Sequence, residues 1–455
     1  MKHDPGAEDS NPAFFPAPDS STPGLHDPYA ALRVPAFRRY MSGNFLSILG
    51  LQMQSAAVAW EVYGRTGQPF SLALVGLVQV LPVLGLAVFA GHVADRFDRR
   101  KIVMTALLAI SAGSIGLALV SALQAPIAIT YACLFLAGLA RAFQQPAKAS
   151  LMPLLVRRRD FPNAVTWNAA AFQLASVLGP AAAGAMIAAF HSTAAVFVCD
   201  ASFALCFCGI LSQVRYRSRV RVPQPFTAKN LSAGARFIWH NKVILAASTL
   251  DMFGVLFGAA VALLPIYAKD ILKVGAAGFG VMQAAPAVGA IGMSFVLSHR
   301  KPMRHAGKSL IWAVIGFGLA TIVFGFSRWF PLSVAMLFMT GAMDNISVVV
   351  RQSLIQLLTP DEMRGRVSAI NGMFISISNE VGDIESGTVA QLFSPTISAV
   401  SGGMGTLAVV AIVAWLFPQL RRYGRLDSAA ASAPLPAERA VEQEVAESQA
   451  PRTAG

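Results

Sequence analysis

Five acidic residues lie inside apolar stretches in the second half of the sequence, namely Asp251, Asp344, Glu380, Asp383 and Glu385, whereas Glu61 and Asp200 in the first half lie nearer the outer ends of their stretches. Burial favours the uncharged form of a carboxylic acid, and a neighbouring acid favours it further, so such groups can take up and release protons. Glu380 and Asp383 are three positions apart and would share one face of a helix, whereas Glu385 would point elsewhere. Asp344, Glu380 and Asp383 are therefore candidate proton carriers. The alternative is that these acids belong to structural ion pairs or hydrogen-bonded networks.

Arg141 also lies within an apolar stretch, and Gln144 follows it by three positions. A charge inside a membrane-spanning helix is unfavourable and is a functional candidate by default. An offset of 203 positions places Arg141 on Asp344, so a cation in one half of the chain corresponds to an anion in the other. We predict that these two charges face each other across a substrate path. The alternative is that Arg141 lies near its helix end and extends its guanidinium to the lipid headgroups.

The elements that must position these side chains are membrane-spanning helices. The chain has 455 residues, of which 55% are hydrophobic and only 13% are charged, too few charges to cover the surfaces of soluble domains. A spanning helix needs about 20 mostly apolar residues, and the apolar stretches do not alternate in polarity as the strands of a membrane β-barrel do. We predict an all-α integral membrane protein with twelve spans, at residues 37–63, 70–94, 102–122, 125–148, 163–190, 194–213, 243–268, 277–298, 308–327, 331–357, 367–392 and 399–420.

The predicted spans form two groups of six. Residues 33–213 are predicted to form an N-terminal bundle and residues 243–423 a C-terminal bundle, joined by a cytoplasmic linker at 214–242. The apolar run 237–240 in this linker predicts a short helix in the lipid headgroup layer. The offset of 203 supports an internal repeat, which is expected of secondary transporters. It superposes Asn168 on Asn371, Gly179 on Gly382 and Gly184 on Gly387.

Basic residues set the orientation of the spans. The net charge is +13, and lysines and arginines gather in every second connection between the apolar stretches. Basic clusters of this kind mark the cytoplasmic side and bind anionic lipid, so they give no reason to expect nucleic acid as a partner. The polar segments 1–32 and 424–455 are therefore predicted to be disordered tails, both in the cytoplasm.

The turn between the second and third spans carries an ordered motif. It runs from Gly91 through Asp95 and Arg96 to Arg99 and Arg100. The glycine permits close approach of two helices, the aspartate can bind the positive N-terminus of a neighbouring helix, and the arginines can pair with carboxylates or lipid phosphate. This stretch resembles the signature loop of the major facilitator superfamily, which latches the cytoplasmic side when the cavity faces out. The alternative is a generic basic loop.

The resemblance to this superfamily covers the whole chain: twelve predicted spans, a linker in the middle and the loop in its expected place. It implies that Arg141 and Gln144 form the Arg-x-x-Gln motif of proton-coupled members. It also implies that Gly179-Pro180, followed by Gly184, forms the Gly-Pro motif of exporters, for which the alternative is an ordinary packing face of small residues. Three further segments resemble the branch that includes enterobactin-type siderophore exporters and macrolide efflux proteins, namely 60–63, 235–239 and 379–382.

Neutral polar and aromatic residues, mostly in the first half, are candidates for the wall of a substrate cavity. Amides can hydrogen-bond a substrate, while indole rings offer apolar and stacking surface. The candidates are Asn44, Gln52, Trp60, Gln79, Trp167, Asn168 and Asn371.

Nothing in the sequence indicates an enzyme. It holds no recognisable Ser-His-Asp set, nucleotide-binding loop or cluster of metal ligands, so no catalytic residue, metal or cofactor is predicted. We predict a proton-coupled exporter of a small amphipathic molecule, siderophore or drug-like, that acts as a monomer in a bacterial inner membrane by alternating access. The alternatives are an importer or lipid flippase on the same fold and, from another class, a membrane sensor that transports nothing.

Overall fold

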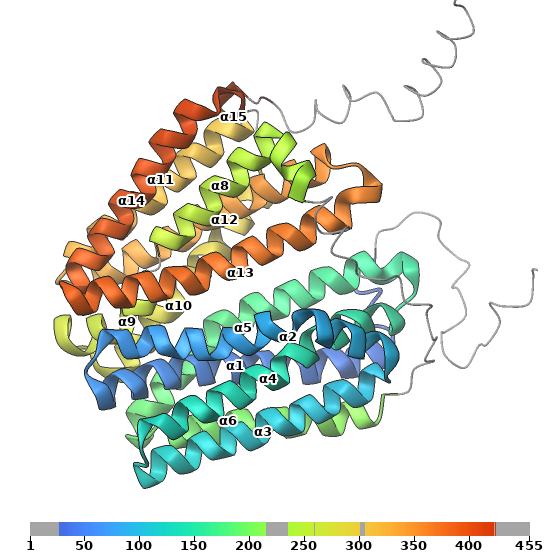
Figure 1. Ribbon diagram of the computed structural model, residues 1–455. Coiled ribbons are helices and arrows are strands. Elements are labelled where there is room, and N and C mark those ends of the chain that lie inside the picture. The colour runs from blue at the N-terminus through green and yellow to red at the C-terminus, as the bar shows by residue number, and fades with distance from the viewer. Residues whose placement is uncertain (1–26, 215–234, 259, 301–304, 423, 425–455) are drawn as a thin grey trace, which may run out of the picture. The chain divides into compact units, whose positions relative to one another are not determined.

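Helices account for all the regular structure in the part of the chain that is described (Figure 1). The structure is a computed structural model, and it describes residues 27–214, 235–258, 260–300, 305–422 and 424. The prediction of an all-α membrane protein is confirmed. Most of the predicted tails and of the linker lies outside the described residues. Residues 27–32 were predicted to belong to a disordered N-terminal tail, but they are described, and Ala31 is fully buried, so the tail was predicted too long. At the end of the linker, residues 235–240 are helical, with Ile238 buried and Trp239 exposed.

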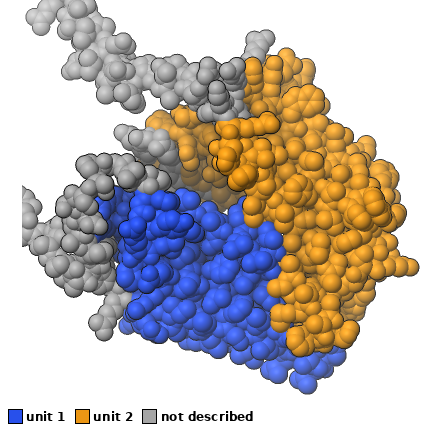
Figure 2. Space-filling view, turned by 180° about the vertical axis from the view of Figure 1, so that it is seen from behind, with its two compact units in different colours: residues 1–54, 81–179, 194–223 blue, residues 55–80, 180–193, 224–455 orange. Residues whose placement is uncertain are grey.

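Contacts along the chain divide the molecule into two compact units, which Figure 2 colours separately. Unit 1 comprises residues 1–54, 81–179 and 194–223, and unit 2 comprises residues 55–80, 180–193 and 224–455. Three helices contribute one part to each unit: α1 Pro35–Thr66, α2 Pro69–Arg96 and α5 Phe161–Phe190. The first part of α2 and the last parts of α1 and α5 therefore belong to the same unit as the second half of the chain.

Unit 1 also contains α3 Arg99–Leu123, α4 Ile127–Leu151 and α6 Ala194–Ser212. α3 packs against both α4 and α6. Large apolar side chains from these helices and from the start of α1 are fully buried together, among them Phe37, Leu107 and Phe207. Lipid is as apolar as these side chains, so close packing and dispersion, and not removal from water, hold these helices to one another.

Unit 2 contains α8 Lys242–Phe257, α10 Gly275–Ser298, α11 Ala306–Phe326, α12 Phe330–Leu358, α13 Asp361–Leu392, α14 Pro395–Leu416 and α15 Pro418–Arg422. α10 packs against α12, α11 against α12 and α14, and α8 against α13 and α14. Glycines permit the closest of these contacts. A Cβ atom on Gly341 of α12 would collide with the backbone of Pro286 in α10, and one on Gly289 would collide with the backbone of Phe338.

The seventh predicted span, 243–268, lies within the candidate membrane span Lys242–Ile271, but this stretch is not one regular helix. α8 ends at Phe257, and the chain continues through a 3₁₀ turn η3 Ala260–Leu263, a short α9 Leu264–Ile266 and a π-helical turn η4 Tyr267–Ile271. Gly258 ends α8 where the ring of Phe317 leaves no room for a side chain. Pro265 then has no N–H with which to continue a regular helix. Such breaks are typical of helices that line a transport site.

Nine helices in the described part of the chain are long and apolar enough to cross a membrane. Three helices at predicted spans do not meet this criterion: α1, α2 and α13. α1 and α13 carry many polar side chains, and only Pro69–Val83 of α2 forms a described apolar segment. The count of twelve spans stays a prediction for these three helices.

Candidate transport site

A cavity with about 820 Å³ of empty space lies within unit 2. Its wall is built from α1, α2, α10, α13 and the broken segment after α8. Two acids, Glu380 and Asp383, face it together with the amides of Gln79 and Gln283. The other described residues that line it are apolar or small, apart from Ser55, and none is basic. The cavity therefore combines negative charge with an apolar wall.

Glu380 projects from α13 toward α2. A Cβ atom on Gly76 would lie 2.8 Å from its Oε2, so the small residue leaves room for the carboxylate. This Oε2 atom is buried and has no hydrogen-bond partner among the described residues, and neither does Oε1 of Gln283. Buried acceptors without donors are unfavourable. The site is thus suited to a ligand that donates hydrogen bonds to these oxygens, or to a proton that binds the carboxylate.

Asp383 connects this cavity to a second one. It lines both spaces, as does Val261, and the second cavity has about 700 Å³ of empty space. Asp344 from α12 and Asn379 from α13 also line the second cavity. Asp344 in turn lines a narrower pocket with Asp251 of α8. Glu380, Asp383, Asp344 and Asp251 thus follow one another along adjoining spaces in unit 2.

Asp251 has a partner that sequence reasoning missed. Arg351 of α12 lies 3.0 Å from its carboxylate, and both side chains are almost completely buried. Arg351 also donates a hydrogen bond of 3.2 Å to Asn371 Oδ1, which places Asn371 in this ion-pair network. In the sequence, the offset of 203 superposes Arg351 on Lys148. This pair of basic residues at repeat-related positions was the signal that could have identified Arg351.

Three predicted polar residues of unit 1 donate hydrogen bonds to a side chain on another helix of the same unit. Asn44 donates to Asn168 at 3.0 Å, which joins α1 to α5. Gln52 donates to Ser176 at 2.8 Å between the same two helices. Arg141 donates to Gln54, and Gln144 is buried beyond it in α4. The amides of Asn44, Gln52 and Asn168 therefore fasten helices together in the described structure, whereas Gln79 lines the acidic cavity.

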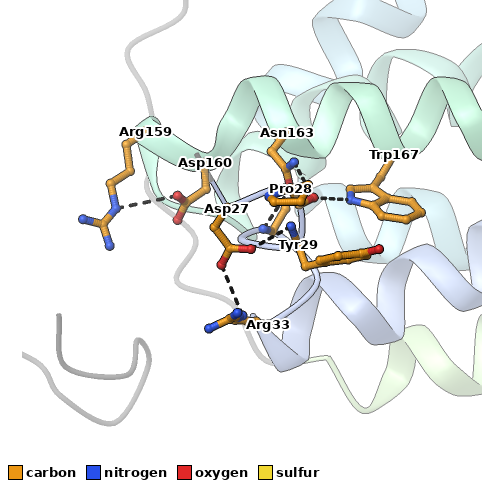
Figure 3. Close-up of polar contacts among 9 residues, drawn as sticks. Asp27, Pro28, Tyr29, Arg33, Arg159, Asp160, Asn163 and Trp167 are labelled. Carbon is orange, nitrogen blue, oxygen red and sulfur yellow. Dashed lines mark hydrogen bonds and ion pairs between the residues drawn. The ribbon is translucent and has the colours of Figure 1, made fainter. Parts of the chain in front are cut away.

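The two predicted tryptophans have different surroundings. Trp60 packs against Phe279 with ring centroids 5.4 Å apart, and Phe279 lines the acidic cavity. Trp167 instead anchors the segment before α1 (Figure 3). Its Nε1 donates to the carbonyl of Pro28 at 3.0 Å, and its ring lies 5.8 Å from that of Tyr29. Trp167 is not among the residues that line the cavities described above.

Asn163 completes this contact at the start of α5. Its Nδ2 donates to the same Pro28 carbonyl at 2.7 Å, and its Oδ1 accepts from the backbone N–H of Ala31 at 3.0 Å. Figure 3 shows both residues pointing at the short segment that precedes α1. The chain entering α1 is thereby fixed to α5.

The second half of the motif between α2 and α3 stabilises two helix ends, the start of α3 and the end of α6. Asp98 caps α3 by accepting from the backbone N–H groups of Arg100 and Lys101, at 2.9 and 3.4 Å. The Arg100 guanidinium donates to the carbonyls of Ser212 and Val214, at the end of α6, where a cation is favoured by the helix dipole.

The first half of the motif lies at the end of α2. The side chain of Asp95 lies outside what the structure describes, so its expected contact with a neighbouring helix stays a prediction. Arg96 is exposed, and a Cβ atom on Gly91 would meet no described atom within 4 Å. Nε of Arg99 is buried without a hydrogen-bond partner among the described residues.

The Gly-Pro segment of α5 makes close helix contacts on both sides of the proline. A Cβ atom on Gly179 would collide with Gln52 of α1, within unit 1. In unit 2, a Cβ atom on Gly184 would lie 2.8 Å from Cα of Gly280 in α10, and one on Gly280 would lie 2.6 Å from the carbonyl oxygen of Pro180. The small residues thus let α5 and α10 touch through their backbones.

A group of polar contacts lies where α1 ends, within unit 2. The Tyr63 hydroxyl donates to Asp270, and Lys269 donates to the carbonyl of Gly64 at 3.2 Å. Nearby, Glu61 accepts from Thr193 at 2.6 Å and pairs with Arg65 at 3.2 Å. These contacts join α1 to the π-helical turn η4 and to the end of α5.

An all-helical membrane protein with polar, broken helices around an acidic cavity belongs to the class of multi-pass membrane transporters. A family model described as transmembrane secretion effector matches residues 26–452, so the chain belongs to this family of the major facilitator superfamily. Similar proteins include the enterobactin exporter EntS of Shigella boydii serotype 18, which is 26% identical over 399 residues, covering 86% of this chain and 93% of the relative. EntS of Escherichia coli O1:K1 has the same identity and coverage.

Solved structures share the fold at lower identity. A bacterial homologue of the human lysosomal transporter Spinster, in an inward-facing and occupied conformation, matches with a TM-score of 0.64 and 13% identity, covering 88% of this chain and 98% of that chain. A mutant of the peptide transporter POT matches with a TM-score of 0.67 and 15% identity, covering 88% and 99%. The protein is thus a transporter and not an enzyme.

Proposed function

We propose that this protein is a proton-coupled exporter of a small amphipathic cation and works by alternating access. The observation that supports this most is the wall of the larger cavity, which holds Glu380 and Asp383 and, among its described residues, no basic group. A cationic ligand there is attracted by two carboxylates at short range and low dielectric. The apolar wall, including Phe279, can take up the hydrophobic part of the same molecule.

The same two acids support coupling to protons. A proton that binds Glu380 or Asp383 removes a negative charge that attracts the cation, so proton and substrate compete for one site. Protonation in the outward-facing state releases the cation, and loss of the proton in the inward-facing state restores the site. Each ligand thereby favours a different conformation, which is the condition for exchange. Asp344, in the adjoining cavity, offers a further position for the proton.

Two groups of residues are candidates for the gates. Tyr63, Asp270 and Lys269 would hold the outer end closed through the contacts at the end of α1. The loop from Gly91 to Arg100, with Asp95 as the central residue, would close the cytoplasmic end. The packing of α5 on α10 at Gly184 would supply the rigid surface about which the helices move.

We also propose where the protein acts in the cell. The chain acts as a monomer in a bacterial inner membrane, with both termini in the cytoplasm, because the basic connections predicted from the sequence belong on that side. Its partners are the substrate, protons and the surrounding lipid.

Transport into everted membrane vesicles tests the acidic site. The paired variant Glu380→Gln with Asp383→Asn should reduce accumulation of a lipophilic cationic dye, such as ethidium, to the level of vesicles without the protein. Glu385→Gln is the matched control, because Glu385 lies on the same helix, accepts from Ser386 and is not among the residues that line the cavities described. Wild-type accumulation by the paired variant, with unchanged pH dependence, would contradict the proposal.

A direct measurement of proton release strengthens the test. Dye added to purified protein in weakly buffered detergent solution should release protons from wild type and from Glu385→Gln, but not from the paired variant. Dye binding without proton release in the wild type would show that the cation and the proton do not share this site.

A siderophore of the enterobactin type is a second candidate substrate, because the similar proteins EntS are named as enterobactin exporters. Secretion of enterobactin by a strain that lacks its own exporter distinguishes the two substrates. Restored secretion without dye transport would show that the substrate is the siderophore and not a cation. Uptake instead of secretion would show that the protein is an importer.

A further inference from the structure

A continuous chain of hydrogen bonds crosses four helices of unit 1. Arg141 of α4 donates through Nη2 to Gln54 Oε1 of α1. Gln54 Nε2 donates to Ser114 Oγ of α3 at 2.9 Å, and Ser114 Oγ donates to Asp200 Oδ2 of α6 at 2.6 Å. Gln54, Ser114 and Asp200 are exposed by 1%, 0% and 3%. A half-buried cation is thus linked to a buried anion through two neutral side chains.

The donors and acceptors of this chain all run in one direction. A guanidinium can only donate and an ionised carboxylate can only accept, while an amide and a hydroxyl can do both. The chain therefore begins at the positive charge and ends at the negative charge, with every intermediate dipole aligned between them. Such an arrangement lets Asp200 balance the charge of Arg141 without direct contact.

Ser114 allows the chain a second arrangement when Asp200 binds a proton. The Ser114 hydroxyl also lies 3.0 Å from the carbonyl oxygen of Ile110, within its own helix. A protonated Asp200 can donate to Ser114 Oγ, and Ser114 then turns its proton to Ile110. Both charge states of Asp200 are thereby hydrogen-bonded, but only the ionised state balances Arg141.

Other ionisable groups on the four helices do not replace this partner. Lys148 lies two turns beyond Arg141 on α4 and adds positive charge near it. Among the described groups, Arg141 is the cation whose charge acts on Asp200. The remaining ionisable side chains on these helices within unit 1 are Arg38, Arg39 and Tyr40 on α1, Arg99, Arg100 and Lys101 at the start of α3, Tyr131 and Cys133 on α4, and Cys199, Cys206 and Cys208 on α6.

We propose that Asp200 is the counter-charge of Arg141 and a further proton-binding residue of the transporter, which acts on Arg141 through Ser114 and Gln54. Binding of a proton to Asp200 leaves Arg141 without its balancing charge, and this favours a different arrangement of α1 and α4. Asp200 is a positioning residue, since it acts through other side chains. The proton-binding step rests on the proposed function, whereas the balance of charge does not.

Melting temperatures of purified variants test the balance of charge. Asp200→Asn and Arg141→Gln should each lower the melting temperature, because each leaves one buried charge unbalanced. The double variant removes both charges and should recover at least half of the larger loss. Ser202→Ala is the control on α6, because Ser202 is exposed and donates within its own helix. Losses that simply add in the double variant would overturn the proposal.

The pH dependence of transport tests the proton-binding step. Asp200→Asn mimics a permanently protonated acid. The ratio of its transport rate at mildly acidic pH to its transport rate at mildly alkaline pH should therefore be closer to one than the ratio of the wild type. Ser114→Ala keeps both charges but breaks the chain, and its ratio should fall between those of Asp200→Asn and wild type. A wild-type ratio in Asp200→Asn would overturn this step. If the wild type itself shows no pH-dependent transport, the proposed function fails while non-additive melting temperatures still support the charge pair.

Discussion

Some buried charged residues of unit 2 are paired with an opposite charge, and others are not. Asp251 and Arg351 lie 3.0 Å apart and are both almost inaccessible, so each satisfies the other. Glu380 faces a cavity with an oxygen that has no partner among the described residues. A buried pair resists a change of charge because either ion alone is strongly unfavourable. We therefore assign Arg351 a structural role and Glu380 a functional one.

Arg351→Met should lower the free energy of unfolding by about 3–5 kcal/mol, because Asp251 would remain as an unpaired buried charge. The double variant with Asp251→Asn should recover most of this loss. Thermal or denaturant unfolding of the purified protein measures both values. Arg33→Met is the control, since its pair with Asp27 is exposed and is worth about 1 kcal/mol or less. Equal effects of the two arginine variants would contradict the structural role.

At the scale of elements, α5 packs against α10, which lines the larger cavity, and the broken segment after α8 forms part of the cavity wall. α5 contacts α1 at Gly179 and α10 at Gly184, each time through backbone that a larger side chain would displace. The break between Phe257 and Leu264 brings Val261 and Ala262 into the cavity wall. A regular helix would present a side-chain ridge there, whereas the break leaves open space beside Asp383.

Gly280→Ala should impair transport and lower stability by about 1–3 kcal/mol, which is the usual effect of overpacking. The new Cβ would lie 2.6 Å from the carbonyl oxygen of Pro180, and backbone cannot move aside as a flexible side chain can. Dye accumulation in vesicles and thermal unfolding measure the two effects. Gly292→Ala on the same helix should behave as wild type, because its Cβ would meet only Phe338 at 3.7 Å. A tolerated Gly280→Ala would mean that α5 and α10 do not need this contact.

At the scale of the whole molecule, the two units hold different chemistry. Unit 2 carries the acidic cavity and the Asp251–Arg351 pair. Unit 1 carries the chain from Arg141 to Asp200. A transporter that changes conformation must also release the contacts that close its ends. In this structure, the polar contacts at the end of α1 are the candidates for such a release.

Tyr63→Phe should shift the protein toward its outward-open conformation. The variant loses the hydrogen bond to Asp270, and a hydrogen bond to a charged group is worth about 1.5 kcal/mol or more, roughly tenfold in population. A cysteine at Ala59, in the cavity wall, reports this shift through its rate of labelling by an impermeant maleimide added outside cells, in a background without other cysteines. Thr66→Val is the control, because Thr66 donates only within its own helix. Unchanged labelling would exclude this contact as a gate.

Much of the fold followed from the sequence because its causes are local. Long apolar stretches with few charges predict helices in lipid wherever they occur, and the described helices begin and end within several residues of the predicted spans. The exception was the break after Phe257. It depends on the ring of Phe317, some sixty positions away, which no spacing rule reveals. The pairing of Glu380 with Asp383 was predictable because two residues three positions apart share a helix face.

The partners of the buried charges were decided only by the tertiary structure. The internal repeat predicts that Arg141 and Asp344 face each other, and this stays a prediction because they lie in different units. Within unit 1, the structure connects Arg141 to Gln54, 87 positions away, and through Ser114 to Asp200. Trp167 was a candidate for the cavity wall, and the hydrogen bond that the structure shows for its indole is to the carbonyl of Pro28, 139 positions away. The sequence alone determined that these polar groups must be satisfied inside an apolar protein. Which group satisfies which depends on how helices far apart in the chain pack together, and helical periodicity carries no information about that.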